Sequence, residues 1–213
     1  MTRSRTVIPL LLAVGCLAGA CAPRYARRAE LPPGEENQRQ AIVDCAAGLL
    51  GVSDLRSLNK NFKNDCSGFV NGVYAMKGRT IAYAKVKKDR SLSESLCLTL
   101  EDKGLAFREG RPNVADAVFF SNTYQAPYNS ITHVGLVEKI GDDGTVSILH
   151  YASGKVSRIS MNLRHPDTHK DEDGKVLNDY VRKDPGGKGR KNYLSGARFH
   201  SYGDVFQFTG NQR

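Results

Sequence analysis

NFKNDCSGFVNGVYAMKG, residues 61–78, has the pattern of a helix with a cysteine in its first turn. Asn64 or Asp65 can accept a hydrogen bond from an unpaired backbone N–H and so cap the start of this helix. Gly78 can end it, because glycine readily takes the left-handed conformation that follows many helices. Apolar side chains recur at helical spacing on Phe69, Val73 and Met76. The stretch therefore predicts a helix that begins next to Cys66.

The position of Cys66 suggests a reactive thiol. The positive end of a helix dipole favours thiolate over thiol, so we expect a lowered pKa for this cysteine. The ordinary alternative is a buried, inert cysteine. Cys45, Cys66 and Cys97 follow the N-terminal apolar segment, and an odd number leaves at least one of them without an intramolecular partner. A disulfide between Cys45 and Cys97 is one of the pairings that the sequence allows.

Two further helices flank this stretch. The first is expected at residues 37–50, where Ile42, Cys45, Ala46 and Leu49 form an apolar stripe that ends before Gly51. The second begins with SLSE, residues 91–94, which has the capping-box pattern. It carries Leu92, Leu96 and Leu100, places Cys97 on or near its buried side, and stops at Gly104. The N-terminal part of the domain is therefore expected to be helical.

After Pro112 the pattern changes to short strands rich in β-forming residues. We expect strands at ADAVFF (115–120), HVGLVEKI (133–140), TVSILHY (145–151), ARFHSY (197–202) and DVFQF (204–208). GDDG, residues 141–144, is a tight-turn signal, so the second and third strands should form a hairpin. Helices followed by an antiparallel meander predict an α+β fold.

The register of this hairpin places two histidines together. A turn centred on Asp142 and Asp143 pairs Ile140 with Thr145, and the same register sets His150 opposite Gly135 and His133 opposite Ala152. Because side chains alternate along a strand, His133 and His150 then share one face as diagonal neighbours. A slip of one residue would separate them, so this prediction depends on the turn.

The N-terminus has the features of an export signal. Arg3 and Arg5 precede an apolar segment too short to span a bilayer, and small residues come before Cys21. A cysteine at this point resembles the lipoprotein signal, in which the cysteine is lipidated; Cys16 is a weaker alternative, and plain secretion is another. We therefore expect a signal peptide at residues 1–20, a lipidated tether at 21–36 and one domain at 37–213. Lipoproteins without an aspartate after the cysteine sort to the outer membrane and face the periplasm, and here Ala22 follows.

The net charge points to an anionic surface. Losing the signal removes Arg3 and Arg5 and no acid, so a formal charge of +9 becomes +7. A basic exported protein suits cell wall or lipid headgroups. Nucleic acid is not expected, because basic and acidic residues are mixed and no nucleic-acid motif is present.

Four motifs together carry a family resemblance. DCSGFV (65–70), ADAVFF (115–120), THVGLV (132–137) and ILHYASG (148–154), in this order, resemble the NlpC-type family of bacterial cell-wall cysteine peptidases, which is related to papain. The likeness spans about residues 37–160, and YLSGARF (193–199) resembles the closing strand of that family. It implies a papain-like α+β fold, with the catalytic cysteine at a helix N-terminus packed on an antiparallel sheet.

The resemblance also implies roles for particular residues. Cys66 would be the nucleophile, His133 the general base and acid, and His150 the residue that orients His133. Asp65 and Ser67 would lie near the substrate cleft. The implied activity is hydrolysis of a peptidoglycan stem peptide between D-glutamate and diaminopimelate, by a monomer that needs no metal or organic cofactor.

Two alternatives stay open, and a departure from the family pattern supports the first of them. VSDLRSLNKNFKN, residues 52–64, lacks the tyrosine and the glycine pair usual before the cysteine, which leaves an N-acetylmuramoyl-L-alanine amidase possible. A catalytically inactive wall-binding lipoprotein is the second alternative. Ala115 also replaces the glycine usual at that position, a change expected to matter little.

A charged insertion (residues 165–192) lies outside the family pattern. It is rich in both signs of charge and too long for a simple connection. We expect either a lid that restricts the size of the substrate or a mobile surface loop.

Overall fold

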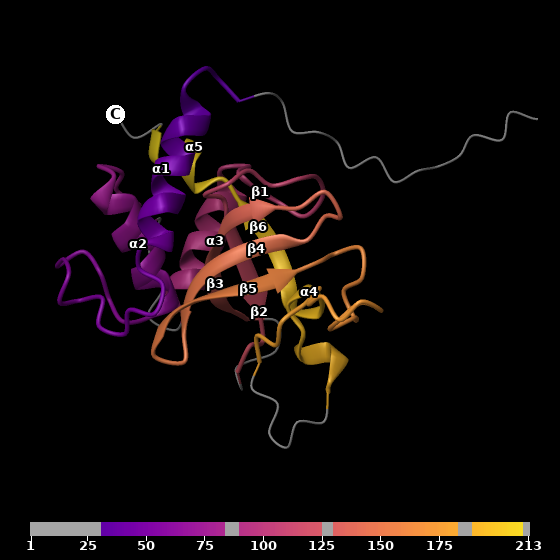
Figure 1. Cartoon of the computed structure of the whole chain (residues 1–213). Helices are drawn as coiled ribbons and strands as arrows, with labels where there is room; N and C mark the ends of the chain where they lie inside the picture. Colours follow the sequence, from indigo (N-terminus) through magenta and orange to yellow (C-terminus); the bar gives the residue numbers. More distant parts are fainter. Residues whose placement is uncertain (1–30, 84–89, 125–129, 183–188, 211–213) are drawn as a thin grey trace, which may run out of the picture.

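The computed structural model describes residues 31–83, 90–124, 130–182 and 189–210 of the chain (Figure 1). Its helices are α1 (Glu35–Ala47), α2 (Cys66–Met76), α3 (Leu92–Asp102), α4 (Ser195–Arg198) and α5 (Val205–Gly210), with a short 3₁₀ helix at Lys191–Tyr193. Its strands are β1 (Ala106–Phe107), β2 (Ala117–Ser121), β3 (Ile131–Ile140), β4 (Val146–Ala152), β5 (Lys155–Met161) and β6 (Phe199–Gly203).

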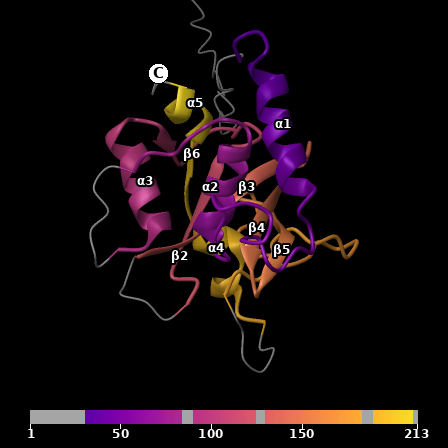
Figure 2. The same ribbon diagram turned by 90° about the vertical axis from the view of Figure 1, so that its left-hand side faces the viewer.

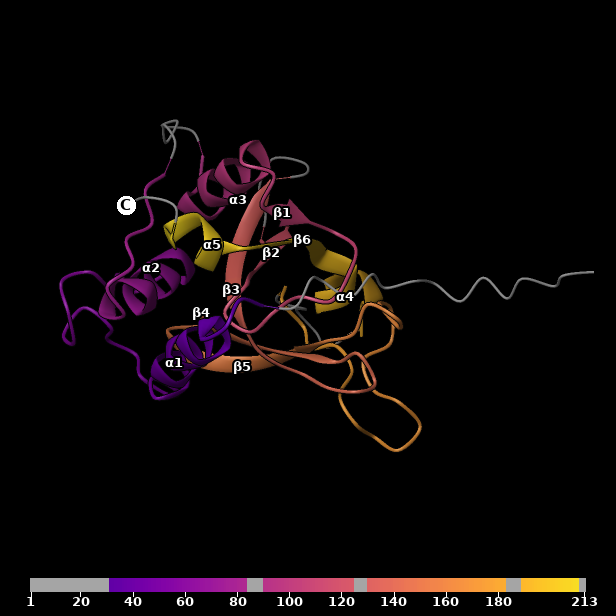
Figure 3. The same cartoon turned by 90° about the horizontal axis from the view of Figure 1, so that it is seen from above.

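The strands form one antiparallel sheet in the order β1-β6-β2-β3-β4-β5. Figure 2 shows α3, α2 and α1 side by side in front of this sheet. Seen from above, α5 lies on the same side, while α4 lies on the other side (Figure 3). The predicted α+β class and the predicted helical N-terminal part are confirmed.

Two apolar clusters fill the two faces of the sheet. Alternate residues of β2 and β3, such as Phe119, Val134 and Leu136, join the larger cluster with the helices. Their neighbours along the strands, such as Val118 and Val137, join a smaller cluster on the opposite face. This separation follows from the two-residue period of a strand, and it fixes the face on which each site residue lies.

Two glycines explain how α2 packs against the loop before it. A Cβ atom added at Gly68 would lie 2.4 Å from the Cβ of Lys63, and one added at Gly72 would lie 2.0 Å from the ring of Phe62. Both distances are too short for any real side chain, so neither position can hold a residue larger than glycine without movement of the loop. The two glycines are four residues apart and therefore lie on one face of the helix. The loop therefore crosses α2 closely, which places Asp65 and Cys66 where the helix begins.

The β3–β4 hairpin keeps the predicted register at Leu136 and Val137 and departs from it near the turn. Leu136 pairs with Leu149 and Val137 with Ile148, as expected, but Ile140 pairs with Val146 rather than Thr145. A bulge between Val137 and Lys139 takes up the extra residue of the turn. A Cβ atom at Gly135 would lie 2.6 Å from Ile148 and 2.9 Å from the carbonyl oxygen of Leu149, so the close pairing of β3 and β4 requires a glycine at this position.

A buried arginine ties the ends of the domain together. Arg39 of α1 is fully buried and donates to Asp116 Oδ1 at 2.9 Å and to Asp204 Oδ1 at 2.8 Å. It also contacts Glu35 at 2.7 Å, so three carboxylates compensate one buried guanidinium. Loss of one partner in such a network leaves an uncompensated buried charge and is strongly destabilising.

Several element predictions need correction. DVFQF is not a strand but α5, since Asp204 accepts a hydrogen bond from the backbone N–H of Gln207 and caps a helix there. ARFHSY forms a strand only from Phe199, and β1 and β5 were not predicted. The first helix starts at Glu35, inside the expected tether, and ends at Ala47. Met76 is 49% exposed rather than part of the apolar face.

Replacement of the usual glycine by Ala115 affects the backbone more than expected. Its φ of +66° lies in the left-handed region, which costs an alanine about 1–2 kcal/mol relative to a glycine free of that restriction. The carbonyl oxygen of Ala115 accepts a hydrogen bond from the Tyr74 hydroxyl at 2.7 Å, and that contact holds the backbone in place.

Cys45, Cys66 and Cys97 are all free thiols in the structure, so the Cys45–Cys97 disulfide is not formed. Cys45 lies against Met76, whereas Cys97 contacts Ser201 and Glu101. The signal peptide, Cys16 and Cys21 lie outside the described residues. Within the described part of the chain, no helix is long and apolar enough to cross a bilayer.

Candidate active site

Cys66 is the first residue of α2, as predicted. Asp65 is the residue that caps the helix, with Oδ1 accepting from the Gly68 N–H at 2.7 Å and from the Ser67 hydroxyl at 2.7 Å. Asn64 instead accepts from the Leu55 N–H at 2.8 Å and holds the preceding loop. The contacts of Asp65 and Ser67 thus order the start of α2, and substrate binding by these two residues stays a prediction.

The predicted acidity of Cys66 is wrong for the resting protein. Burial raises the pKa of the Cys66 thiol, and the neighbouring Asp65 carboxylate raises it further. Hydrogen bonds from the backbone N–H groups of Val134, Ser67 and Cys66 lower it in part. Desolvation of the charged sulfur therefore outweighs the favourable helix start, and the thiol is protonated at neutral pH.

The two histidines are bonded to each other, as the register predicted. His133 Nε2 lies 2.7 Å from His150 Nδ1, and the rings meet nearly edge to face at an angle of 83°. Burial lowers the pKa of His133 to about 3, with the charge of His150 contributing, and burial lowers that of His150 to about 4. Both rings are therefore neutral at pH 7, so one nitrogen of the pair donates and the other accepts.

A cleft of about 790 Å³ opens beside this pair. Both histidines line it, together with Lys155 and Ser157 of β5 and with Tyr180, Val181, Arg182 and Gly189 of the charged insertion. Cys66 is not among its lining residues; it is half-buried and packs with the helix-side core. In the described part of the chain no hydrogen bond joins the Cys66 sulfur to either imidazole, and the His133 ring lies near Phe120, whose side chain belongs to the cluster on the opposite sheet face. The structure thus joins the two histidines to each other and leaves the thiol with the helix-side core, apart from them.

Tyr83 packs against the same core as Cys66, and no sequence motif singles it out. Its hydroxyl accepts a hydrogen bond from Asn71 Nδ2 of α2. Burial raises the pKa of Tyr83 to about 12, and the charges of Asp65 and Cys66 add to the increase. The hydroxyl therefore keeps its proton beside the thiol, where it can donate a hydrogen bond.

The charged insertion is anchored through one buried asparagine. Asn178 is fully buried, and its Nδ2 donates to the carbonyl oxygens of His165 and Thr168, each at 2.8 Å. Its Oδ1 accepts from the N–H groups of Asn162 at 2.9 Å and Gly196 at 3.0 Å. A mobile surface loop would not have a buried, fully hydrogen-bonded side chain at its centre. The described part of the insertion is therefore an ordered segment that lines the cleft.

Comparisons with known proteins give a distant structural likeness. No family model matches the chain, and no curated protein matches it significantly. A crystal structure of a Staphylococcus aureus protein called similar to lipoprotein, NLP/P60 family, aligns with 81% of this chain at 18% identity and a TM-score of 0.38. The chain spans 43% of the length of that protein. The geometry of the site, rather than this likeness, supports the function proposed below.

Proposed function

We propose that this protein is an exported peptidoglycan hydrolase in which Cys66, His133 and His150 cleave an amide bond. One observation carries the proposal: the 2.7 Å bond between His133 Nε2 and His150 Nδ1 on β3 and β4, with Cys66 at the start of α2, the helix that packs on β3. A nucleophile, a base and a third group that orients the base are the parts that covalent amide hydrolysis needs. The order of motifs around them supports a papain-like fold of the NlpC type.

The histidine bond suggests how the proton moves. If His133 Nε2–H donates to His150 Nδ1, then the other ring nitrogen of His133, Nδ1, is left as a proton acceptor, and the proposal requires it to come within hydrogen-bond reach of the Cys66 thiol during the reaction. The same Nε2–H bond persists when His133 becomes an imidazolium, so His150 holds the ring in both states. Because the thiol rests in its protonated form, this transfer accompanies attack rather than preceding it.

The reaction then follows in two steps. The Cys66 sulfur attacks the amide carbonyl carbon, His133 gives its proton to the departing amine, and the C–N bond breaks to leave a thioester. Water, deprotonated by His133, releases the acid and restores the thiol. The backbone N–H of Cys66, at the free start of α2, can stabilise the negative oxygen in both steps.

The charge of the cleft agrees with an acidic substrate. Lys155 and Arg182 both line it, and stem peptides carry free carboxylates. We propose the bond between D-glutamate and diaminopimelate as the one that is cut. A lipid on Cys21 would hold the enzyme at a membrane, with the outer membrane and periplasm as the proposed location and a monomer as the proposed state.

Mass spectrometry of purified peptidoglycan after incubation with the protein tests this proposal. New diaminopimelate amino termini support the proposed bond, whereas free L-alanine amino termini would assign the amidase instead. Absence of any product, with the wall retained by the folded protein, would leave the inactive wall-binding lipoprotein.

A further inference from the structure

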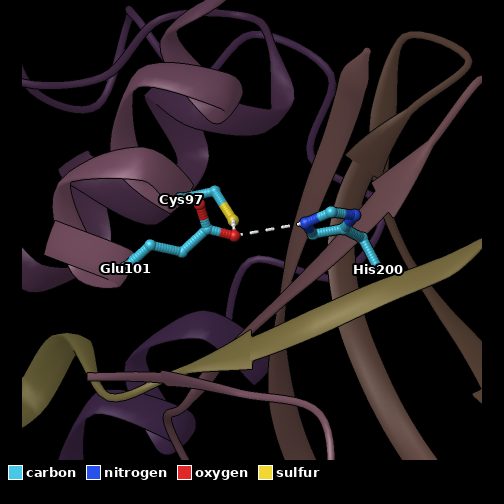
Figure 4. Close-up of side chains that lie close together, drawn as sticks. All are labelled: Cys97, Glu101 and His200. Atoms are coloured by element: carbon cyan, nitrogen blue, oxygen red, sulfur yellow. Dashed lines mark hydrogen bonds and ion pairs between the residues drawn. The ribbon is translucent and has the colours of Figure 1, made fainter. Parts of the chain in front are cut away.

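A second group of reactive side chains lies between α3 and β6. Figure 4 shows Cys97 and Glu101, one turn apart on α3, facing the ring of His200 on β6. The Cys97 sulfur lies 3.8 Å from Glu101 Oε1, and the same oxygen lies 3.3 Å from His200 Nε2. One ligand atom from each residue lies within 4.8 Å of the other two. We call Cys97, Glu101 and His200 the α3–β6 cluster.

The spacing in this cluster suits a shared ion. Zinc binds sulfur at about 2.3 Å and nitrogen or oxygen at about 2.0–2.2 Å, so tetrahedral ligand atoms lie about 3.3–3.7 Å apart. The oxygen–nitrogen distance of 3.3 Å falls in this range, and the sulfur–oxygen distance of 3.8 Å lies just outside it. Without an ion, the same two atoms form a hydrogen bond that is longer than the usual value of about 2.9 Å.

Burial and charge in the α3–β6 cluster also suit a divalent cation. Cys97 is fully buried, whereas the side chains of His200 and Glu101 are 21% and 42% exposed, so an ion and one water can enter from the solvent side. A thiolate and a carboxylate together balance two positive charges. The Ser201 hydroxyl, 3.4 Å from the Cys97 sulfur, can support the thiolate with a hydrogen bond.

We propose that Cys97, Glu101 and His200 form a zinc site that joins α3 to β6, with water as the fourth ligand. Mixed sulfur, nitrogen and oxygen ligands favour zinc over magnesium or calcium, which prefer oxygen alone. Burial raises the pKa of the Cys97 thiol to about 12, so the metal-free thiol is protonated. Zinc binding breaks that S–H bond, releases the proton to water and forms the S–Zn bond.

Arg108 makes this proposal unusually easy to test. Its guanidinium lies 3.2 Å from His200 Nδ1. An imidazole that binds metal through Nε2 carries its proton on Nδ1, so a guanidinium N–H cannot donate there as well. Arg108 is exposed and can move away from His200. In its present position, its hydrogen bond to His200 Nδ1 and its positive charge both weaken binding of a cation. Removing this side chain should therefore strengthen zinc binding.

The test uses the full chain carrying Cys66→Ala, which removes the other thiol that lies near histidines. Titration with zinc should show one equivalent bound and a higher Tm. Glu101→Gln and His200→Ala should each weaken binding at least about tenfold. Arg108→Met should strengthen it several-fold. Cobalt in place of zinc should give a sulfur-to-cobalt charge-transfer band that Cys97→Ser abolishes.

Three outcomes would overturn the zinc site. The first is that neither the Cys66→Ala chain nor its Arg108→Met variant binds zinc. The second is a cobalt complex without a thiolate band. The third is unchanged affinity in Glu101→Gln and His200→Ala, which are partly exposed positions and should fold even if Cys97→Ser does not. None of these results bears on hydrolysis by Cys66, so the two proposals fail independently.

Discussion

The molecule holds a cysteine with histidine in two places, and the two differ in what surrounds the sulfur. Cys66 begins a helix, so backbone N–H groups point at its sulfur, and the nearby imidazoles are bonded to each other. Cys97 lies in the middle of α3, where no backbone N–H is free, and a carboxylate stands between its sulfur and His200.

This difference in surroundings suits Cys66 and Cys97 to different chemistry. A thiol at a helix start, with free backbone N–H groups nearby, can act as a nucleophile whose oxyanion is stabilised, whereas the thiol of Cys97, in the middle of a helix and beside Glu101, is suited to bind a cation. Burial raises the pKa of both thiols; the Glu101 carboxylate adds to the increase at Cys97, whereas backbone hydrogen bonds reduce it in part at Cys66. The predictions below test whether catalysis belongs to the first site alone.

The largest expected effect is on the two cysteines. Cys66→Ala should lower the rate of peptidoglycan hydrolysis at least about a thousandfold, because the step that forms the thioester is lost. Cys97→Ala, the matched change in the α3–β6 cluster, should leave the rate within about twofold in metal-free buffer. Fragment release from purified sacculi measures both. Equal losses of rate in the two variants would contradict the claim that Cys66, and not Cys97, is the nucleophile.

The histidines should differ in the same way. His133→Ala should lower kcat about 10²- to 10⁴-fold, since the base and acid is removed. His150→Ala should lower it less, about 10- to 100-fold, because this ring orients His133 and does not exchange the proton. His200→Ala is the control and should retain activity. An undiminished rate in His133→Ala would exclude this residue as the base.

The histidine pair should also make stability depend on pH. Their pKa values fall from 6.5 to about 3 and about 4 in the folded protein, so the unfolded chain binds more protons between those values and 6.5. Stability should therefore rise with pH across this window and be lost progressively as pH falls below 6.5. Tm measured from pH 4 to pH 7 checks the slope. The double variant His133→Gln/His150→Gln should flatten it; an equally steep slope there would place its origin elsewhere.

The smallest expected effect concerns Tyr83. Tyr83→Phe should lower kcat/KM about threefold to tenfold, the loss of one hydrogen bond, without lowering Tm by more than a few degrees. Tyr124→Phe, at an exposed position, is the matched control. No difference between the two variants in kcat/KM would mean that the Tyr83 hydroxyl does not reach the substrate.

Local patterns were enough to predict the helix at Cys66 and the histidine pair. The Asp65 cap and the alternation of side chains along β3 and β4 are short-range features, and they fixed where these residues lie. The longer turn did not disturb the result, since a bulge restored the register before His133. Short-range sequence signals thus sufficed wherever neighbours along the chain or across one turn decide the geometry.

Features that depend on contacts between distant segments were not predicted. Burial by the whole domain, rather than the helix dipole, decides the pKa of Cys66. The cleft needs residues of the charged insertion, and Cys97 and His200 meet only because β6 returns beside α3. Because the buried Asn178 holds the insertion together, single changes at the cleft, Tyr180→Ala or Arg182→Ala, test whether the insertion acts as a lid.

A stem-peptide analogue that carries an electrophilic ketone in place of the scissile amide tests the central claim most directly. Peptide mapping after one hour should find one equivalent of label on Cys66, with Cys45 and Cys97 unmodified, and much slower labelling in His133→Ala. The same electrophile without the peptide should label Cys66 far more slowly, because the resting thiol is protonated. Label spread over all three cysteines, or none on Cys66, would contradict a stem-peptide hydrolase built on this thiol.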